Sequence, residues 1–254
     1  MEKEGKYVYC IVETKQERNF GSIGIGNNEV LAIGYEDLSM VVSNRPMTRI
    51  VVSRENMVAH EKVIEEVMKE FDSVLPVRFG TIASDADEIR NLLDRRYREF
   101  MNLLRDMDHK IELGVKGLWT EMNAIFMEIA NESKEIKRLK RTIQEKGSAK
   151  DSQLKMEIGR LVHEGLQEKK AKEADKVVDA LRRTAIDHKL NSTSGDEMFM
   201  NAAFLVDKGR EKEFDNIMDD LSEELEKRAK FMYAGPLPVF NFVNVVIYPE
   251  EWER

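Results

Sequence analysis

Short apolar runs predict strands in the first part of the chain. Residues 6–13 are rich in Tyr, Val and Ile, as in a strand. Two more apolar runs, at 30–33 and 38–43, follow a Gly-rich loop at 20–28. The run Leu75-Pro76-Val77-Arg78-Phe79-Gly80 predicts a further strand. Its proline indicates a strand start or a sheet edge, because proline has no backbone N–H to donate.

Two stretches with helical periodicity accompany these strands. Ser53 is a suitable N-cap for an amphipathic helix that extends to about Phe71. Ser84 is the corresponding cap of a second helix, whose apolar stripe consists of Ile89, Leu93, Tyr97, Phe100 and Leu104. Strands combined with two helices predict an α+β domain, a variant of the ferredoxin-like fold, over residues 1–107.

A long charged stretch predicts a helical hairpin in the second part of the chain. Apolar residues recur at steps of three and four over 122–143 and again over 154–185, on either side of a turn at 147–152. This pattern is typical of an antiparallel coiled coil, here inserted at about 121–190. The apolar contact line between the two helices is interrupted at Glu132, Gly165 and Glu168. Bending or fraying is expected there.

Strand patterns flank the predicted hairpin. One strand is expected at 111–118, and another at 198–206 after a loop at 191–196. A helix follows, with one apolar face made of Phe214, Ile217, Leu221 and Leu225. Two closing strands are predicted at 230–234 and 239–248, so that residues 108–254 form a second α+β domain.

Composition narrows the class of protein. The chain has 254 residues, 42% hydrophobic and 35% charged, which is typical of a soluble, helix-rich protein. Its net charge of −8 disfavours wholesale coating of nucleic acid. The single Cys10 excludes an internal disulfide and is expected to be a small core residue. With neither a signal peptide nor an apolar run near the roughly 20 residues of a membrane span, a cytoplasmic protein is expected.

Charge is unevenly distributed along the chain. Residues 134–172 hold 12 Lys or Arg and 6 Asp or Glu, a net charge of +6, so the remainder carries −14. This basic arm has two interpretations: binding to RNA phosphates, or contact with an acidic protein surface. The segment between residues 127 and 198 contains no Phe, Tyr or Trp that could stack on bases, which favours a protein partner.

No motif predicts catalysis or a cofactor. Gly24-Ile25-Gly26 lacks the third glycine of a dinucleotide fingerprint and is interpreted as a loop. The histidines at 60, 109, 163 and 188 lack the spacing of metal ligands, and His60 is interpreted as a hydrogen-bonded core or interface residue. The sequence contains no nucleophile elbow and no phosphate-binding lysine motif. We therefore predict no enzyme activity, no metal, no cofactor and no small-molecule ligand.

Two short segments contain the candidate partner-binding residues. The first supplies Pro76, Arg78 and Phe79; strand alternation turns Arg78 away from Val77. Arg78 can bind a partner's carboxylate, or it can tie the first domain to the second, and we favour the structural role. The second segment supplies Gly235, Pro236 and Pro238. A rigid corner between two strands is its first interpretation and an exposed docking surface its second.

The second segment belongs to the run Gly235-Pro236-Leu237-Pro238-Val239-Phe240-Asn241-Phe242-Val243. This run and the run from Leu75 to Gly80, in this order, resemble those of the GvpF/GvpL family of gas-vesicle proteins. Four further segments fit the strands and the first helix of that family: Tyr7-Val8-Tyr9-Cys10-Ile11-Val12, Ala59-His60-Glu61, Glu112-Leu113-Gly114-Val115-Lys116 and Ala202-Ala203-Phe204-Leu205-Val206-Asp207. The chain departs from the family at Cys10, at Val239-Phe240 and in the long charged insert at 130–190. The resemblance does not distinguish F from L.

The resemblance implies a non-catalytic accessory role in gas vesicle assembly. The implied partners are the hydrophobic shell protein GvpA and other accessory Gvp proteins, and the protein would associate with the vesicle. An unassembled shell subunit exposes apolar surface that aggregates unless it is covered. The first domain, with its Leu75-to-Gly80 strand, is the expected contact. The alternatives are a nucleic-acid-binding regulator that uses the basic arm and, ranked last, a small enzyme on a ferredoxin-like fold.

Overall fold

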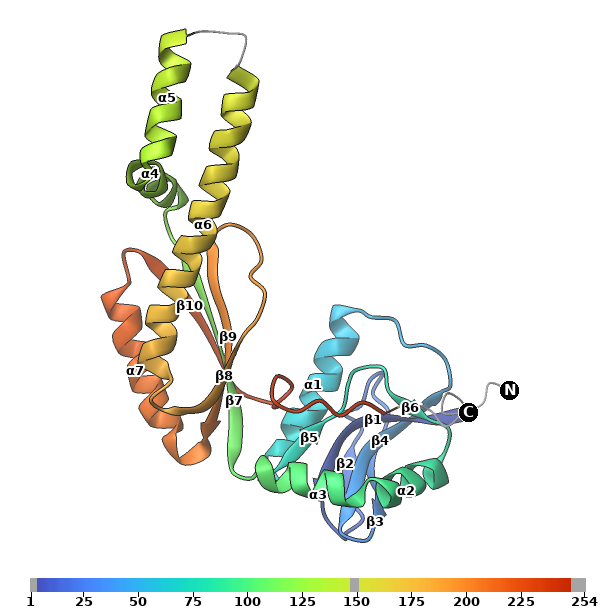
Figure 1. Ribbon diagram of the computed structural model, residues 1–254. Helices are drawn as coiled ribbons and strands as arrows, with labels where there is room; N and C mark the ends of the chain where they lie inside the picture. The colour runs from blue at the N-terminus through green and yellow to red at the C-terminus, as the bar shows by residue number, and fades with distance from the viewer. Residues whose placement is uncertain (1–3, 147–150, 248–254) are drawn as a thin grey trace. The chain divides into compact units, whose positions relative to one another are not determined.

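A computed structural model describes residues 4–146 and 151–247, which form two compact units (Figure 1). Unit 1 contains the chain up to Glu112, the segment Leu205–Gly209 and the segment from Gly235 onward. Unit 2 contains Leu113–Phe204 and Arg210–Ala234. One boundary near residue 107 was expected. The two compact units instead alternate along the chain, because its last described segment packs with its first.

Unit 1 is built around an antiparallel sheet with the strand order β2-β3-β4-β1-β5, and β6 also pairs with β1. Its strands are β1 Glu4–Glu13, β2 Asn19–Gly21, β3 Val30–Tyr35, β4 Leu38–Pro46, β5 Val74–Pro76 and β6 Ile82–Ala83. A bulge in β1 shifts the register between Val8 and Cys10. Because of this shift, Tyr9 and Cys10 both belong to one hydrophobic core, while Val8 belongs to the other.

Helices cover both faces of this sheet. Helix α1 (Arg54–Met68) packs Val63, Ile64 and Val67 against one face. Its predicted cap is confirmed, since Ser53 Oγ accepts a hydrogen bond from Asn56 N at 3.2 Å. The other face is covered by α2 (Ala86–Arg95) and α3 (Tyr97–Asp106). The result is a helix–sheet–helix unit whose two cores meet at β1.

Two details of the second helix were predicted wrongly. The N-cap is Asp85 instead of Ser84, because the Asp85 carboxylate accepts from the backbone N–H groups of Asp87 and Glu88. The helix is also divided in two at Arg96, whose backbone leaves helical geometry. The Arg96 guanidinium lies over the Phe100 ring at 4.7 Å and donates to the Val246 carbonyl at 2.7 Å. The contacts of the Arg96 side chain with Phe100 and Val246 thus accompany the break between α2 and α3.

The last described segment, residues 239–247, belongs to unit 1 and contains a turn. The strand predicted at 239–248 was therefore wrong over these described residues. Phe242 N and Val243 N both donate to the Val239 carbonyl. The buried carboxylate of Glu112 accepts from Asn241 N at 2.9 Å and from Asn241 Nδ2 at 2.6 Å. This clamp turns the chain, and Val245 then forms a single parallel bridge with Val77.

Unit 2 contains most of a four-stranded sheet with the order β10-β7-β9-β8. The strands are β7 Lys110–Trp119, β8 Ala185–Leu190, β9 Met198–Asp207 and β10 Ala229–Leu237. A short 3-10 turn, Lys208–Arg210, precedes α7 (Glu211–Glu224), which packs Phe214 against Phe204 of the sheet. Strand β8 was not predicted, because its highly exposed residues lack the alternation of a buried strand.

A helical hairpin extends from this sheet (Figure 1). Its first arm is α4 (Met122–Glu132) followed by α5 (Lys134–Lys146), and its second arm is the 31-residue helix α6 (Asp151–Leu181). The expected bend lies at Ser133, which has extended backbone and whose Oγ accepts from Ile136 N. The predicted turn at 147–150 lies outside the described residues. The hairpin and the α+β class are confirmed; the coiled-coil and ferredoxin-like descriptions stay predictions.

Gly165 is a point of close approach, in contrast to the predicted fraying, and α6 runs through it without interruption. A Cβ atom at this position would lie 2.7 Å from Ile129 Cγ2 of α4, which is closer than real contacts allow. The absence of a side chain therefore lets the two arms touch. Among the described residues, no helix is long and apolar enough to cross a membrane.

Replacing Gly165 with Ala should destabilise the hairpin, although alanine is the better helix former. The overpacking against Ile129 is expected to cost about 1–3 kcal/mol, against a propensity gain of about 1 kcal/mol. Gly159→Ala is the matched control in the same helix, because a Cβ atom at that position would have no neighbour within 4 Å. Thermal unfolding should show a lower Tm for Gly165→Ala and an unchanged or higher Tm for Gly159→Ala. Equal behaviour of the two variants would refute the close-contact interpretation.

Candidate functional site

The two segments singled out in the sequence border one hollow in unit 1, with a volume of about 590 Å³. The second segment contributes through residues that follow its prolines. Helix α1, the end of β5 and the C-terminal turn form three sides of this hollow, which we call the apolar groove. Its lining residues are Met57, His60, Glu61, Pro76, Arg78, Phe79, Phe240, Val243, Asn244 and Val245.

His60 lies at the base of the groove and links three parts of unit 1. Its Nε2 lies 3.1 Å from the Val77 carbonyl oxygen, and its Nδ1 lies 2.8 Å from Tyr7 Oη. A carbonyl only accepts, so Nε2 must carry the proton and Nδ1 must accept from the Tyr7 hydroxyl. Tyr7 Oη in turn accepts from Gly80 N at 3.2 Å. Every polar atom of the imidazole thus has a partner.

Burial keeps this imidazole neutral. His60 is only 3% exposed, and desolvation lowers its pKa to about 4, although the hydrogen bond to Val77 opposes the shift. Burial likewise raises the pKa of the Tyr7 hydroxyl well above its ordinary value. Both groups therefore stay uncharged at neutral pH. The interpretation of His60 as a hydrogen-bonded core histidine agrees with this geometry.

Aromatic rings surround His60. The Tyr9 ring stacks on it at 5.5 Å between centroids, Phe79 meets it edge-on at 5.6 Å, and Phe240 lies at 6.2 Å. Tyr9 is itself fixed by a hydrogen bond to Ser43 Oγ at 2.9 Å and by a bond from Ile25 N, also at 2.9 Å. These contacts fix Tyr9 beneath His60, which lines the groove together with Phe79 and Phe240.

The mouth of the groove is apolar. Met57 is 50% exposed and Phe240 is 38% exposed, and both line the hollow. Val51 and Val52, in the loop before α1, are 73% and 69% exposed. Exposed Met57 and Phe240 at the edge of a hollow are characteristic of a surface that a partner covers.

Two charged side chains border the groove. Arg78 is exposed, and its side chain has neither an ion pair nor a hydrogen bond with the residues that the structure describes. The tie between domains predicted for it is therefore absent from the described part of the chain. Glu61 is half-buried, and burial, with a smaller contribution from Glu65, raises the pKa of its carboxyl group. The groove thus offers one cation and one carboxylate at its rim.

The six predicted residues are not all brought together. Pro76, Arg78 and Phe79 line the groove. Gly235 and Pro236 are exposed residues within β10, joined by a cis peptide bond, so they do not form a corner between two strands. Pro238 is buried just before the C-terminal turn. The groove residues that the prediction omitted come from that turn and from α1: Met57, Glu61, Phe240, Val243, Asn244 and Val245.

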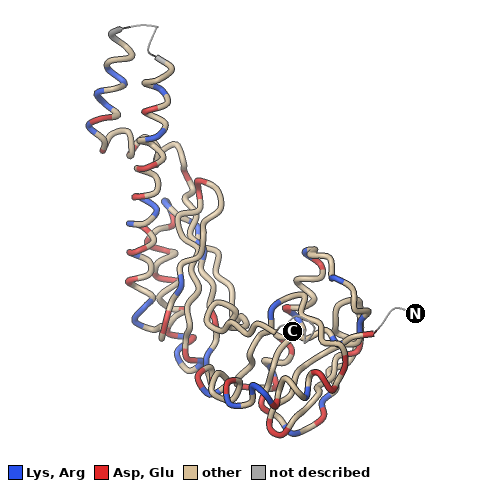
Figure 2. The backbone as a smooth tube through the Cα atoms, turned by 45° about the vertical axis from the view of Figure 1, so that its right-hand side comes forward, with Lys and Arg blue, Asp and Glu red and all other residues tan. Residues whose placement is uncertain are grey.

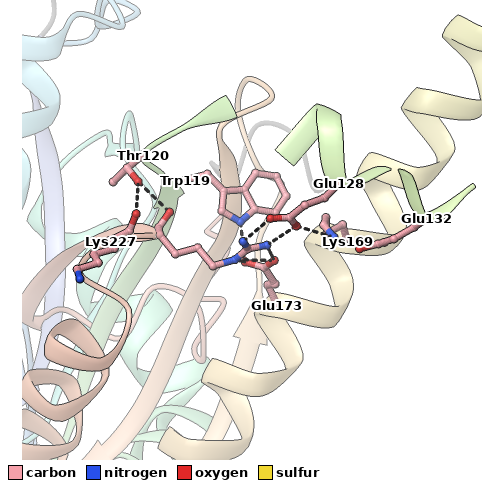
Figure 3. Close-up of polar contacts among 8 residues, drawn as sticks. Trp119, Thr120, Glu128, Glu132, Lys169, Glu173 and Lys227 are labelled. Atoms are coloured by element: carbon pink, nitrogen blue, oxygen red, sulfur yellow. Dashed lines mark hydrogen bonds and ion pairs between the residues drawn. The ribbon is translucent and has the colours of Figure 1, made fainter. Parts of the chain in front are cut away.

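A second polar cluster lies in unit 2, at the junction of the hairpin with the sheet (Figure 3). Arg228, just before β10, donates to Glu128 of α4 at 2.8 Å and to Glu173 of α6 at 2.5 Å. Glu173 also accepts from Trp119 Nε1 at 2.6 Å, and Lys169 binds Glu128 at 2.9 Å. Arg228, and then Lys169, lower the pKa of Glu128 to about 2. We call this set the Arg228 cluster; it fixes both hairpin arms to the sheet.

Neither cluster resembles a reactive centre. Within residues 4–146 and 151–247, no group of three or more His, Cys, Asp or Glu side chains is placed to hold a metal ion. Cys10 is buried and unpaired, and burial raises the pKa of its thiol. Gly24 to Gly26 form a turn before β3, as interpreted from the sequence, with Gly24 N donating to the Asn28 carbonyl.

The family comparison decides where this fold belongs. The family model described as "Gas vesicle synthesis protein GvpL/GvpF" matches residues 5–244. The chain belongs to the GvpL/GvpF family. Gas vesicle protein F of Streptomyces sp. strain CB03234 is 28% identical over 94% of this chain and 99% of its own length. Gas vesicle protein F1 of Halobacterium salinarum is 26% identical over 98% of this chain and 97% of its own length.

Solved structures of GvpF proteins have the same fold. The crystal structure of GvpF from Anabaena sp. PCC7120 aligns with a TM-score of 0.81 at 22% identity, and covers 96% of this chain and 100% of that one. GvpF from Microcystis aeruginosa aligns with a TM-score of 0.78 at 21% identity, over 95% and 99% of the two chains. The mixed α and β architecture is therefore common to these GvpL/GvpF proteins.

The buried His60 should make this family member sensitive to mild acid. Its pKa is about 4 when folded and about 6.5 when unfolded, so the unfolded chain binds the proton more tightly between these values. This contribution to stability is complete above pH 6.5 and decreases by about 3 kcal/mol as the pH falls to 4. Urea unfolding at pH 7, 6, 5 and 4 measures it.

His60→Gln is the informative variant, since an amide can both accept from Tyr7 and donate to Val77 without titrating. It should lose less stability than the wild type over the same pH range. His109→Gln is the control: that imidazole is exposed, and Asp108 raises its pKa, which gives the opposite sign. A His60 imidazole that titrates near pH 6.5 by NMR in the folded protein would contradict the assignment.

Removing the cation of the Arg228 cluster should loosen the hairpin. Arg228→Met leaves Glu128 and Glu173 partly buried without their main partner, and we expect a loss of roughly 2 kcal/mol. Arg160→Met is the matched control, because Arg160 also binds two carboxylates, Glu157 and Glu164, but on an exposed surface. That change should cost much less, because exposed ion pairs contribute little to stability. Hydrogen exchange should increase in α4 only for Arg228→Met; equal effects would exclude a special role for the cluster.

Proposed function

We propose that this GvpL/GvpF protein is a non-catalytic accessory protein that binds the hydrophobic shell protein GvpA before or during shell formation. Other accessory Gvp proteins are further partners in this role. The observation that carries the proposal is the apolar groove, in which Pro76, Arg78 and Phe79 meet the C-terminal turn around a neutral, buried His60. The family description, gas vesicle synthesis, supports an assembly role.

The geometry favours a helix as the ligand over an added strand. Strand β5 is at one end of the sheet, but the bridge between Val77 and Val245 already occupies the next position at that edge. The hollow beside it is open and has apolar and aromatic walls, which suits the apolar face of an amphipathic helix. Arg78 at the rim would then pair with a carboxylate on that helix.

The six candidate residues take different parts in this proposal. Pro76, Arg78 and Phe79 contact the shell protein directly. Gly235, Pro236 and Pro238 act through the chain path that delivers Phe240 to the groove. The contact thus needs the proposed N-terminal domain, residues 1–107, together with the C-terminal turn that completes unit 1.

Introducing charge at the groove should weaken capture of the shell protein. Met57→Glu and Phe240→Asp each place a carboxylate in the apolar contact, and we expect affinity to fall at least about tenfold, or about 1.4 kcal/mol. Co-expression of the full-length chain with GvpA, followed by pull-down, measures the effect.

Met127→Glu is the matched control for Met57→Glu. Met127 is an exposed methionine of α4, 65% exposed, so the same substitution tests unit 2 at little cost to folding. Binding should remain at the wild-type level. Retention of GvpA by both groove variants, or an equal loss with Met127→Glu, would move the contact away from the groove.

A further inference from the structure

The outward face of α5 carries a stripe of cations. Ile136 and Leu139 are buried, which fixes the inner side of this helix. Spacings of three and four residues place the cations on the opposite side, and all of them are exposed. Figure 2 shows Lys and Arg positions recurring along this arm. The stripe consists of Lys134, Lys137, Arg138 and Arg141.

This stripe is unfavourable for α5 in isolation. Like charges three and four residues apart repel, and cations in the first turn oppose the helix dipole. Only Arg138 has an intrahelical partner, Glu135. Lys134, Lys137 and Arg141 form no ion pair with the residues that the structure describes. Sequences break such local rules mainly at functional sites, so we infer that these charges face a binding partner.

Helix α7 has the opposite arrangement. Its last turns hold exposed carboxylates, and no basic residue accompanies them. Carboxylates at a helix C-terminus oppose the dipole, and those four residues apart repel each other. None of the four forms an ion pair within the described part of the chain. They are Asp219, Asp220, Glu223 and Glu224.

The two faces cannot neutralise each other within one molecule. Both helices belong to unit 2 and contact α6, α5 toward its first end and α7 toward its last (Figure 1). Helix α6 has 31 residues, and at 1.5 Å per residue it is about 46 Å long. A single chain therefore presents a basic stripe near one end of a long helix and an acidic stripe near the other.

We propose that the basic face of α5 docks on the acidic face of α7 in a second copy of this chain. Two molecules whose α6 helices run antiparallel about a two-fold axis make this contact twice, so the dimer is closed. The charges match in number, four cations against four carboxylates. The pairing also relieves the repulsion within each helix, which is why the occupant is a second copy.

An RNA ligand fits these features less well. It would neutralise α5 but would leave the carboxylates of α7 unexplained, and the chain as a whole carries a charge of −8. No Phe, Tyr or Trp lies between residues 127 and 198 to stack on bases. A self-complementary surface accounts for both helices at once.

Charge reversal on the full-length protein tests the proposal. The wild type should dimerise at about 0.05 M salt in sedimentation velocity, with the dissociation constant rising at least about tenfold at about 0.5 M salt. The double variants K137E/R141E and D220K/E223K should each be monomeric, because both contacts of either homodimer then repel. Circular dichroism and Tm should stay near the wild-type values, since the altered side chains are exposed.

Mixing the two variants is the decisive measurement. The acidic α5 of one then faces the basic α7 of the other, and the two remaining helices keep their original charges, so an equimolar mixture should form a heterodimer. R54E/K62E on the exposed face of α1 changes the net charge equally and should leave dimerisation unchanged.

The proposal is overturned if the wild type is monomeric at low salt, if either reversed variant dimerises alone, or if the mixture stays monomeric. A monomeric wild type that binds polyuridylate through Lys137 and Arg141 would overturn it in favour of RNA. Assembly without GvpA present separates this test from the function proposed above.

Discussion

The hydrogen bonds of His60 are the interaction on which unit 1 depends. Through them one buried imidazole joins α1 to strand β1 and to the end of β5. Its faces support Tyr9 on one side and Phe240 on another. Because burial makes the charged form costly, the ring works only as a neutral donor and acceptor. The groove therefore has a polar anchor beneath an apolar surface.

This arrangement suits a binding protein for a hydrophobic partner. An apolar hollow that collapses in water is a poor receptor, whereas one built on satisfied hydrogen bonds keeps its shape. The clamp between Glu112 and Asn241 serves the same purpose on the third side of the groove. In unit 2 the Arg228 cluster again uses half-buried charge to fix a projecting element, the long helical hairpin, to a sheet.

Local patterns predicted most of the elements and part of the groove. The Ser53 cap, the strand at 6–13, the hairpin and the interpretation of His60 as a hydrogen-bonded core residue all follow from short-range patterns, and the structure agrees with them. The errors arise where a distant residue decides. Residues 239–247 are rich in Val, Phe and Ile, as a strand would be, but the carboxylate of Glu112 binds Asn241 and the chain turns there.

The same reason explains the incomplete site prediction. Pro76, Arg78 and Phe79 were found because an unusual run draws attention to them, whereas Met57 resembles any residue on an amphipathic helix. Its role emerges only when the C-terminal turn packs beside α1. A sequence signal for this side of the groove did exist. It is the largely apolar run Phe240-Asn241-Phe242-Val243, which follows Gly235-Pro236 by four residues. At the second helix the cap is Asp85, one residue after the predicted Ser84, and only the backbone geometry identifies it.

The order of the units along the chain has a consequence for synthesis. The ribosome releases the first 112 residues of unit 1, then unit 2 interrupted by Leu205–Gly209 of unit 1, and only after Ala234 the segment with Phe240 and Val245. Until that segment emerges, the hollow lacks one of its walls and β5 has an open edge. The groove that we propose as the binding surface is therefore complete only after unit 2 has been synthesised and Phe240 and Val245 have joined unit 1.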